Sequence, residues 1–264
     1  MSTSSPGGPF REQPRSPAAG HAEPPAVPGL HAQVLEQVGL AICEGRLSAG
    51  EILHAEAFEA EFQVSRSVIR EVLRVLSAMG MVASRRRVGV QILPPEEWNL
   101  FDPRIIRWRL ASTERLAQLR SLAELRTAVE PQAARLAAER ATPDQVSELL
   151  ALAGQMWAAG SNGDSEEFLR VDMQFHQLLL TASGNDMFAQ LHRLVAEVLI
   201  GRAHYGLMPQ LPHHEALQLH MDVAAAVQAG SGSDAQAAME RIVERSTEET
   251  ADFWARHSAE TAPE

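Results

Sequence analysis

Asp172, His176 and His220 are the residues of this chain whose chemistry is easiest to assign. Asp172 and His176 lie four positions apart in a stretch with helical periodicity, so both side chains project from one face of a helix. A carboxylate and an imidazole on one face form half of a site for a divalent metal. His220 lies in a later helical stretch and supplies a third ligand if the two helices face each other. The alternative is a purely structural Asp–His pair joined by a hydrogen bond, and the spacing alone leaves both interpretations open.

A row of arginines has chemistry suited to nucleic acid. Arg66, Arg70 and Arg74 recur at every fourth position, while the large apolar residues between them recur on a different face. Ser65 stands just before this stretch and is a good N-cap, because its hydroxyl can accept a hydrogen bond from an unpaired backbone amide. A helix with an exposed arginine row fits the major groove of DNA, where Arg binds guanine edges and phosphates. The simpler alternative is a solvated helix face.

The elements around this row predict a winged helix-turn-helix. An apolar pattern over 55–62 marks a shorter helix just before Ser65, and Gly80 ends the second helix. Short strands are expected around Val82 and at 90–92, joined by a basic hairpin tip that forms the wing. We predict DNA contacts from the whole unit: Ser65, Arg66, Ser67, Arg70, Arg74, Arg85, Arg86, Arg87 and Gly89.

Residues 64–73, Val-Ser-Arg-Ser-Val-Ile-Arg-Glu-Val-Leu, resemble the recognition-helix motif of the GntR superfamily of bacterial repressors. The resemblance spans the helix, the turn and the wing. It implies that the protein binds double-stranded operator DNA as a homodimer. The sequence departs from the family pattern at Ala57, because an arginine often follows the glutamate at this point of the preceding helix, and the contact of that arginine is missing here.

The charge balance is acidic. The 264-residue chain has 34 acidic and 23 basic side chains and a formal net charge of −11, which is unusual for a nucleic-acid-binding protein. Between 30 and 93 the arginines roughly balance the acids, so a local positive face can still bind DNA. The single cysteine, Cys43, excludes a disulfide within the chain and indicates a reducing compartment. No apolar run is long enough to span a membrane and no hydrophobic signal core begins the chain, so we expect a cytoplasmic protein without membrane contact.

Composition and periodicity divide the chain into five segments. Residues 1–28 are rich in Pro, Gly and Ser and are predicted to be a disordered tail. A winged helix-turn-helix domain at 29–94 is followed by a linker at 95–112, whose aromatic residues predict that it packs against a domain. Residues 113–257 contain six predicted helices with short loops, which indicates a helical bundle, and 258–264 form a flexible tail. The expected fold class is therefore mostly α, with a winged domain and an all-helical domain.

Helix starts in the second domain are marked by capping residues. Thr142 with Gln145 has the pattern of a capping box, and Asp164 and Asn185 each stand before a further apolar stretch. Pro131 falls inside a long first helix, where a proline favours a kink. These signals place the Asp–His pair on the third helix of the bundle.

Three segments of the helical region resemble the FCD class of C-terminal domains, found in the FadR-like branch of the GntR superfamily. They are 124–126 (Glu-Leu-Arg), 130–131 (Glu-Pro) and 172–176 (Asp-Met-Gln-Phe-His). The resemblance implies a helical effector-binding domain that is usually dimeric. It also implies a divalent metal, zinc or a similar ion, held in many members by one Asp and three His.

The metal ligands implied by this resemblance are only partly present. Asp172, His176 and His220 match the first three ligand positions. The fourth position is Ile242, which cannot bind a metal, so the implied site has three protein ligands and a reduced affinity. His192 is a possible substitute, although its helix face favours an ordinary, partly exposed histidine.

The linker and the last helix resemble the branch that includes the galactonate-operon repressors. The linker residues are Glu97-Trp98-Asn99 and Asp102 to Trp108, and the last helix lacks the ligating histidine. This resemblance implies a sugar acid or related small carboxylate as effector, with oxygens that complete a metal sphere while Arg126 binds the carboxylate. The alternative for Arg126 is a structural salt bridge with Glu130, four residues on.

The sequence analysis therefore favours a ligand-responsive transcriptional regulator that acts as a repressor. Two other classes of protein remain open at this stage. A metal-dependent enzyme could use the Asp–His cluster with an open coordination position, although no nucleophile or general base is placed beside it. An architectural DNA-binding protein would need no effector, and the cluster would then be a satisfied polar group of the core.

Overall fold

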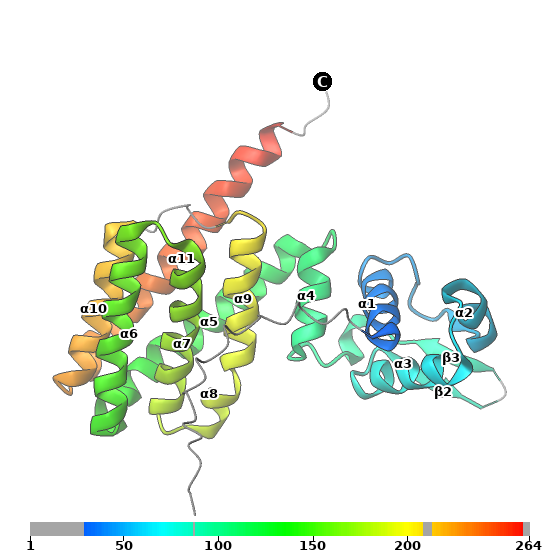
Figure 1. Ribbon diagram of the computed structural model, residues 1–264, viewed down its shortest axis with the longest axis horizontal. Helices are drawn as coiled ribbons and strands as arrows, with labels where there is room; N and C mark the ends of the chain where they lie inside the picture. Colours follow the sequence, from blue (N-terminus) through cyan, green and yellow to red (C-terminus); the bar gives the residue numbers. More distant parts are fainter. Residues whose placement is uncertain (1–28, 87, 208–212, 261–264) are drawn as a thin grey trace, which may run out of the picture.

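The computed structural model describes residues 29–86, 88–207 and 213–260, with side chains through Ala251. The chain forms two bodies, a small winged domain and a larger helical bundle, which are joined through the helix α4 (Pro103–Ala111) (Figure 1). This architecture confirms the predicted fold class. The predicted tail at 1–28, the wing residue Arg87 and the last four residues of the chain lie outside the described residues.

The winged domain contains three helices and a small sheet: α1 (Leu30–Cys43), α2 (Ala55–Phe62), α3 (Arg66–Ala78), β1 (Ile52–Leu53), β2 (Val82–Arg85) and β3 (Gly89–Ile92). The sheet is antiparallel in the order β1-β3-β2, with Ile52 opposite Gln91 and Val82 opposite Ile92. The sequence predicts β2 and β3 but favours a turn at the residues of β1. A two-residue strand is too short to show an alternating pattern, and only its pairing with β3 defines it.

The core of the winged domain lies between α1, α3 and the sheet. Ile69, Val72 and Leu76 project from α3 into this core, as the apolar spacing predicts. Gly80 follows the end of α3 with a φ of 75°, a left-handed conformation that glycine adopts without strain. Ser65 does occupy the N-cap position, but its hydroxyl lies 2.8 Å from the Ser67 hydroxyl and caps no backbone amide. The predicted position of the cap is therefore correct and its predicted hydrogen bond is wrong.

The helix α4 packs against both domains. Asp102 caps it by accepting a hydrogen bond from the amide of Arg104, as the Asp-Pro pair predicts. Two faces of α4 are buried in different cores. Ile105 and Trp108 pack into the core of the winged domain, and Ile106 and Leu110 pack into a core of the bundle.

The aromatic residues of the predicted linker have different surroundings. Trp108 is buried and its indole nitrogen donates to Glu36 Oε2 on α1 at 2.6 Å. Trp98 is half-buried and donates to the carbonyl of Leu93. Phe101 is 58% exposed, so the predicted packing of the linker rests on Trp98 and Trp108 and on the isoleucines of α4.

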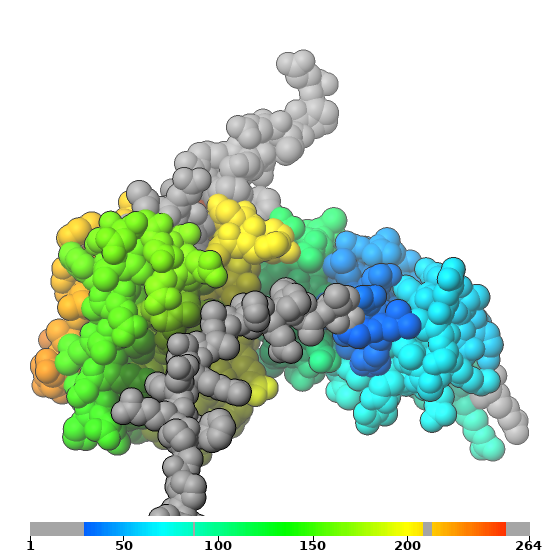
Figure 2. Space-filling view, in the orientation of Figure 1, coloured from blue at the N-terminus to red at the C-terminus, as the bar shows by residue number. Residues whose placement is uncertain are grey.

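The bundle consists of α5 (Arg115–Arg140), α6 (Pro143–Asn162), α7 (Ser165–Ala182), α8 (Asp186–Gln190), α9 (His192–His204), α10 (His214–Gln228) and α11 (Gly232–Glu260). α11 packs along α5 and α10, and α7 packs against α6 and α9. In a space-filling view the bundle, green to orange, and the winged domain, blue to cyan, form distinct bodies (Figure 2). α5 continues through Pro131 without ending. No helix among the described residues is long and apolar enough to cross a membrane.

Helix starts in the bundle follow the predicted caps. Thr142 and Gln145 form a capping box, Asp164 accepts from the amide of Glu167, and Asn185 accepts from the first amides of α8. The predicted fourth helix, however, is interrupted at Leu191 and forms α8 and α9, so the bundle has one helix more than expected. His192 Nδ1 donates to the carbonyl of Ala189 at 2.7 Å, and this side-chain bond competes with the backbone bond that would continue the helix.

Candidate metal centre, cavity and nucleic-acid interface

Asp172, His176 and His220 converge inside the bundle, as the helical spacing and the resemblance predict. Asp172 and His176 project from α7, and His220 projects from α10. Asp172 Oδ1 lies 3.3 Å from His176 Nε2 and 3.4 Å from His220 Nε2, and one ligating atom from each residue lies within 4.8 Å of the others. All three side chains are buried. The cluster therefore has the donor set and proximity that a divalent cation requires.

Three buried atoms of this cluster form no hydrogen bond among the described residues: Asp172 Oδ1, His176 Nδ1 and His220 Nε2. Two of them, Asp172 Oδ1 and His220 Nε2, face each other across the centre of the cluster. His220 Nδ1 lies 2.7 Å from the carbonyl of Ala216, to which only an N–H can donate, so the neutral ring carries an unprotonated Nε2 that faces the carboxylate. A lone pair facing a carboxylate is unfavourable, and either a proton on Nε2 or a metal ion between the two groups removes the repulsion.

The distances also fit a tetrahedral ion. Zinc binds imidazole nitrogen and carboxylate oxygen at about 2.0–2.1 Å, so adjacent ligands of a tetrahedral site are about 3.3–3.4 Å apart. The two separations from Asp172 Oδ1 match this edge length. The separation of 3.3 Å between His176 Nε2 and Asp172 Oδ1 is also within the range of a long hydrogen bond, which is the alternative interpretation.

Behind the cluster lies a buried ion pair that orients His176. Glu130 Oε2 lies 2.6 Å from His176 Nδ1, and Glu130 Oε1 accepts from Arg126 Nε at 2.5 Å. Because Nδ1 is turned toward Glu130, Nε2 of the same ring is left for a metal, and a carboxylate behind the ring is the usual arrangement at a ligating histidine. Sequence reasoning treated Glu130 only as a partner of Arg126. Its contact with His176 was missed because it joins α5 to α7, which residue spacing does not reveal.

The neighbouring charges in this network shift the pKa of each buried group toward its charged form. Burial alone would raise the pKa of Glu130, but Arg126 and His176 lower it to about 2. Burial would lower the pKa of His176, but the carboxylates of Glu130 and Asp172 raise it to about 9. The two imidazoles likewise hold the pKa of Asp172 well below its usual range, although burial opposes them. The surroundings of His176 therefore favour a positive charge, either a proton or a metal.

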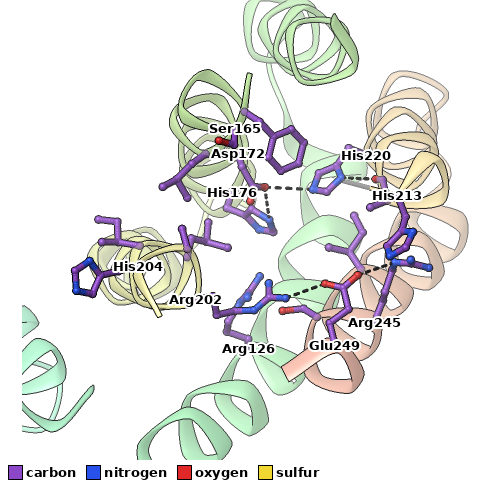
Figure 3. A pocket seen from close by; sticks show the side chains of 18 of the residues that line it. Arg126, Ser165, Asp172, His176, Arg202, His204, His213, His220, Arg245 and Glu249 are labelled. Atoms are coloured by element: carbon purple, nitrogen blue, oxygen red, sulfur yellow. Dashed lines mark hydrogen bonds and ion pairs between the residues drawn. The ribbon is translucent and has the colours of Figure 1, made fainter. Parts of the chain in front are cut away.

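The cluster opens into a cavity of about 530 Å³ between α7, α9, α10 and α11 (Figure 3). Arg126, Arg202 and Arg245 contribute cationic side chains to its lining, and Glu166, Asp172 and Glu249 contribute carboxylates. Burial and the charge of Arg126 lower the pKa of Arg202 to about 10, a value that still leaves it protonated at neutral pH. Buried guanidinium groups at a cavity suit a small anionic ligand.

Ile242, which the resemblance puts at the fourth ligand position, lines this cavity. His192 lies apart from the cluster, because its ring nitrogen is bonded to Ala189 at the break between α8 and α9. Arg126 lines the cavity but its Nε is bonded to Glu130, so the salt-bridge alternative is present. Arg202 was missed by sequence reasoning. The available signal was its position four residues after Val198, on the apolar face of its helix.

The arginines of α3 are exposed, as the spacing predicts. Arg66 lies 3.8 Å from Glu56 and 4.0 Å from Glu59, which are loose contacts with α2. Arg74 donates twice to Glu71 one turn earlier. Arg70 has no ion-pair partner among the described residues, so its guanidinium is available to a ligand.

The wing is a hairpin of β2 and β3 with exposed basic residues. Arg85 donates to Gln91 across the hairpin at 2.9 Å, and Arg86 is exposed at the turn. Gly89 has a φ of 133°, and a Cβ there would lie 2.8 Å from the Ile52 side chain, so the close approach of β1 requires glycine. The predicted contact of Arg87 lies outside the described residues.

Comparison with known proteins divides the chain in the same way as the structure. Residues 30–92 match the bacterial regulatory proteins of the gntR family, and residues 121–245 match the FCD domain. The galactonate operon transcriptional repressor of Escherichia coli (strain K12) is 29% identical over 219 residues, covering 81% of this chain and 94% of that protein. The uncharacterised HTH-type transcriptional regulator YieP of the same organism is 31% identical over 164 residues, covering 62% of this chain and 71% of that protein. The chain belongs to the GntR family.

The fold of this GntR-family protein is also found among solved structures. Lar, which controls the expression of the Listeria monocytogenes agr system, is 17% identical with a TM-score of 0.53, over 86% of this chain and 98% of the other. As a GntR-family protein with an FCD domain, the chain is a ligand-responsive, DNA-binding transcriptional regulator. The family consists of regulators, and this excludes the metal-dependent enzyme considered from the sequence.

Proposed function

We propose that this regulator represses an operon for the catabolism of a sugar acid or a related carboxylate, and that it leaves its operator when the acid binds. The observation that carries the proposal is the buried Asp–His–His cluster, with two unsatisfied ligating atoms, at a cavity lined by arginines. The similarity to the galactonate operon transcriptional repressor supports an aldonate as the effector.

Asp172, His176 and His220 would hold a divalent metal, zinc or a similar ion, and Ile242 leaves the fourth position without a protein ligand. A metal with open positions supplies binding sites for carboxylate and hydroxyl oxygens. Glu130 fixes the ring of His176, and Arg126 adds positive charge to the same wall. An aldonate therefore matches the cavity better than a neutral sugar.

The DNA interface in this proposal is the exposed face of α3 with the wing. It comprises Ser65, Arg66, Ser67, Arg70 and Arg74 from the start and body of α3, and Arg85, Arg86, Arg87 and Gly89 from the wing. Two copies in a homodimer would place two α3 helices on the half-sites of a near-palindrome. Effector binding in the bundle would then change the spacing of the two winged domains.

Calorimetry tests the proposal. D-galactonate is titrated into the full-length protein after metal stripping and again after loading with zinc. We expect tighter binding to the loaded protein, because metal and effector share a site and their binding is positively coupled. The same loaded protein should release its operator fragment on addition of D-galactonate. Equal affinities in the two preparations would remove the metal from effector sensing and make the Asp–His cluster structural.

A further inference from the structure

Arg202 is a buried cation whose partners come from a different helix. Its side chain is 6% exposed, and it lines the same cavity as the Asp–His cluster. The guanidinium donates from Nη2 to Glu249 Oε2 at 3.0 Å and from Nε to Thr250 Oγ1 at 3.3 Å. Both acceptors belong to α11, so this group links α9 to α11 at the cavity (Figure 3).

The other buried arginine of the cavity cannot exchange its partner easily. Arg126 is bonded to Glu130, whose side chain is 1% exposed and also contacts His176 Nδ1. An incoming carboxylate that took Arg126 Nε would leave Glu130 buried with its main cationic partner lost. An uncompensated buried charge is strongly unfavourable. Arg126 is therefore suited to holding the cluster in place.

Glu249 is in a different position, because it has a second cationic partner. Its Oε1 accepts from Arg245 Nε at 3.1 Å on the same helix, and its side chain is 22% exposed. Arg245 in turn donates to Glu215 Oε2 at 2.6 Å. If Glu249 leaves Arg202, its carboxylate remains paired with Arg245 and partly hydrated, so no buried charge is left without a partner.

We propose that Arg202 binds the carboxylate of the effector and that Glu249 is the internal carboxylate that the effector replaces. The inference rests on the proposed function, since it assigns the group that recognises the acid. The exchange keeps Arg202 paired, because one carboxylate leaves the guanidinium as another arrives. It follows that the site selects anions over neutral polyols of the same shape. It also follows that effector binding removes the ion pair between α9 and α11.

The test compares three substitutions in zinc-loaded, full-length protein by calorimetry. Glu249→Gln removes the competing charge, Arg202→Gln removes the anion site, and Glu215→Gln is a matched control. Glu215 pairs with Arg241 and Arg245 at the exposed end of the same ion-pair chain. The probes are D-galactonate and D-gluconate, each paired with its neutral polyol, galactitol or glucitol. Thermal melting and operator binding check that each variant is folded.

The expected pattern is specific to the exchange. E249Q should bind the aldonate roughly fivefold or more tightly than the wild type, and R202Q roughly tenfold or more weakly, since hydrogen bonds to charged groups are strong. E215Q should match the wild type, and the polyols should gain nothing from E249Q. Adding E249Q to R202Q should not increase the affinity for the aldonate, because the Arg202 guanidinium for which Glu249 competes is absent.

Two other outcomes separate the claims. If an aldonate binds the loaded wild type but E249Q and R202Q bind it equally well, the exchange is overturned and the proposed function stands. If neither aldonate binds the loaded wild type or E249Q, the sugar-acid effector and the exchange are both wrong. Because E249Q keeps the buried arginine, its result decides the matter even if R202Q fails to fold.

Discussion

Arg70 and Arg74 lie one turn apart on α3 but have different surroundings. Arg74 is already bonded twice to Glu71, whereas Arg70 has no ion-pair partner among the described residues. Arg70→Ala should therefore weaken specific operator binding by about 1–3 kcal/mol if it contacts bases, and Arg74→Ala should weaken it less. Fluorescence anisotropy with the operator and with a scrambled duplex measures both. Equal, negligible losses would remove this face of α3 from the DNA interface.

Cys43 is the residue whose reactivity the fold should suppress. Burial, with a smaller effect of Glu44, raises the pKa of its thiol from 9.0 to about 12, although Arg109 opposes the shift. Since the thiolate is the nucleophile, the native protein should react with a thiol reagent at pH 8 roughly a hundredfold or more slowly than the urea-unfolded chain. The native rate should also keep rising as the pH passes 9.0, the ordinary pKa of the thiol. A native rate that begins to level off near this pH would show an accessible, unshifted thiol.

At the residue scale, sequence spacing predicted contacts within a helix better than contacts between helices. Asp172 and His176 share a face because four residues make about one turn, and the resemblance added His220. Nothing in the spacing places Glu130 against His176, or Glu249 against Arg202, which is 47 positions away in the chain. Such pairs depend on how the helices pack, and that is decided by the whole core.

The wing is expected to contact DNA differently from α3. Arg86 is exposed at its tip and favours phosphate or minor-groove contact over base contact. Arg86→Ala should lower the slope of log affinity against log salt by about 1 and leave sequence preference unchanged. Arg170→Ala on α7 is the matched control, since it removes the same charge from the bundle surface. A changed sequence preference with an unchanged slope would assign Arg86 to base contact.

The contact between α1 and α4 is close enough to test by adding one methyl group. A Cβ at Gly39 would lie 2.5 Å from the ring of Trp108, and a Cβ at Gly154 in α6 would meet nothing within 4 Å. Gly39→Ala should destabilise the protein by about 1–3 kcal/mol through overpacking. Gly154→Ala should stabilise it by up to about 1 kcal/mol through helix propensity. Urea unfolding measures both, and a neutral Gly39→Ala would mean that the two helices separate readily.

At the element scale, helix ends were predicted where a side chain caps a backbone amide. Thr142, Asp164 and Asn185 all form the expected bonds, because these bonds are local in sequence. The two-residue strand β1 was missed because it exists only through pairing with β3. The break at Leu191 was missed because a histidine side chain competes there with the backbone.

At the scale of the whole molecule, one packed path joins the cavity to the winged domain. α9 lines the cavity with Arg202 and packs against α4, where Leu110 lies against Gly201. α4 in turn packs against α1 through Trp108, which is bonded to Glu36. If effector binding shifts α9, this packing would pass the shift to the winged domain through helices, and the coupling between effector and operator measures it.

Coupling between effector and operator must be reciprocal. If D-galactonate weakens operator binding by some factor, then the operator weakens D-galactonate binding by the same factor, typically about 5- to 150-fold. Arg107 of α4 lies 3.2 Å from Glu197 of α9, and this pair fixes one helix on the other. Arg107→Ala should leave both separate affinities near those of the wild type but reduce the coupling by up to about fivefold, because an exposed pair contributes roughly 0.2–1 kcal/mol. Arg104→Ala, on the same helix, is the control. Full coupling in Arg107→Ala would mean that the signal reaches the winged domains by another route, such as a change at the dimer interface.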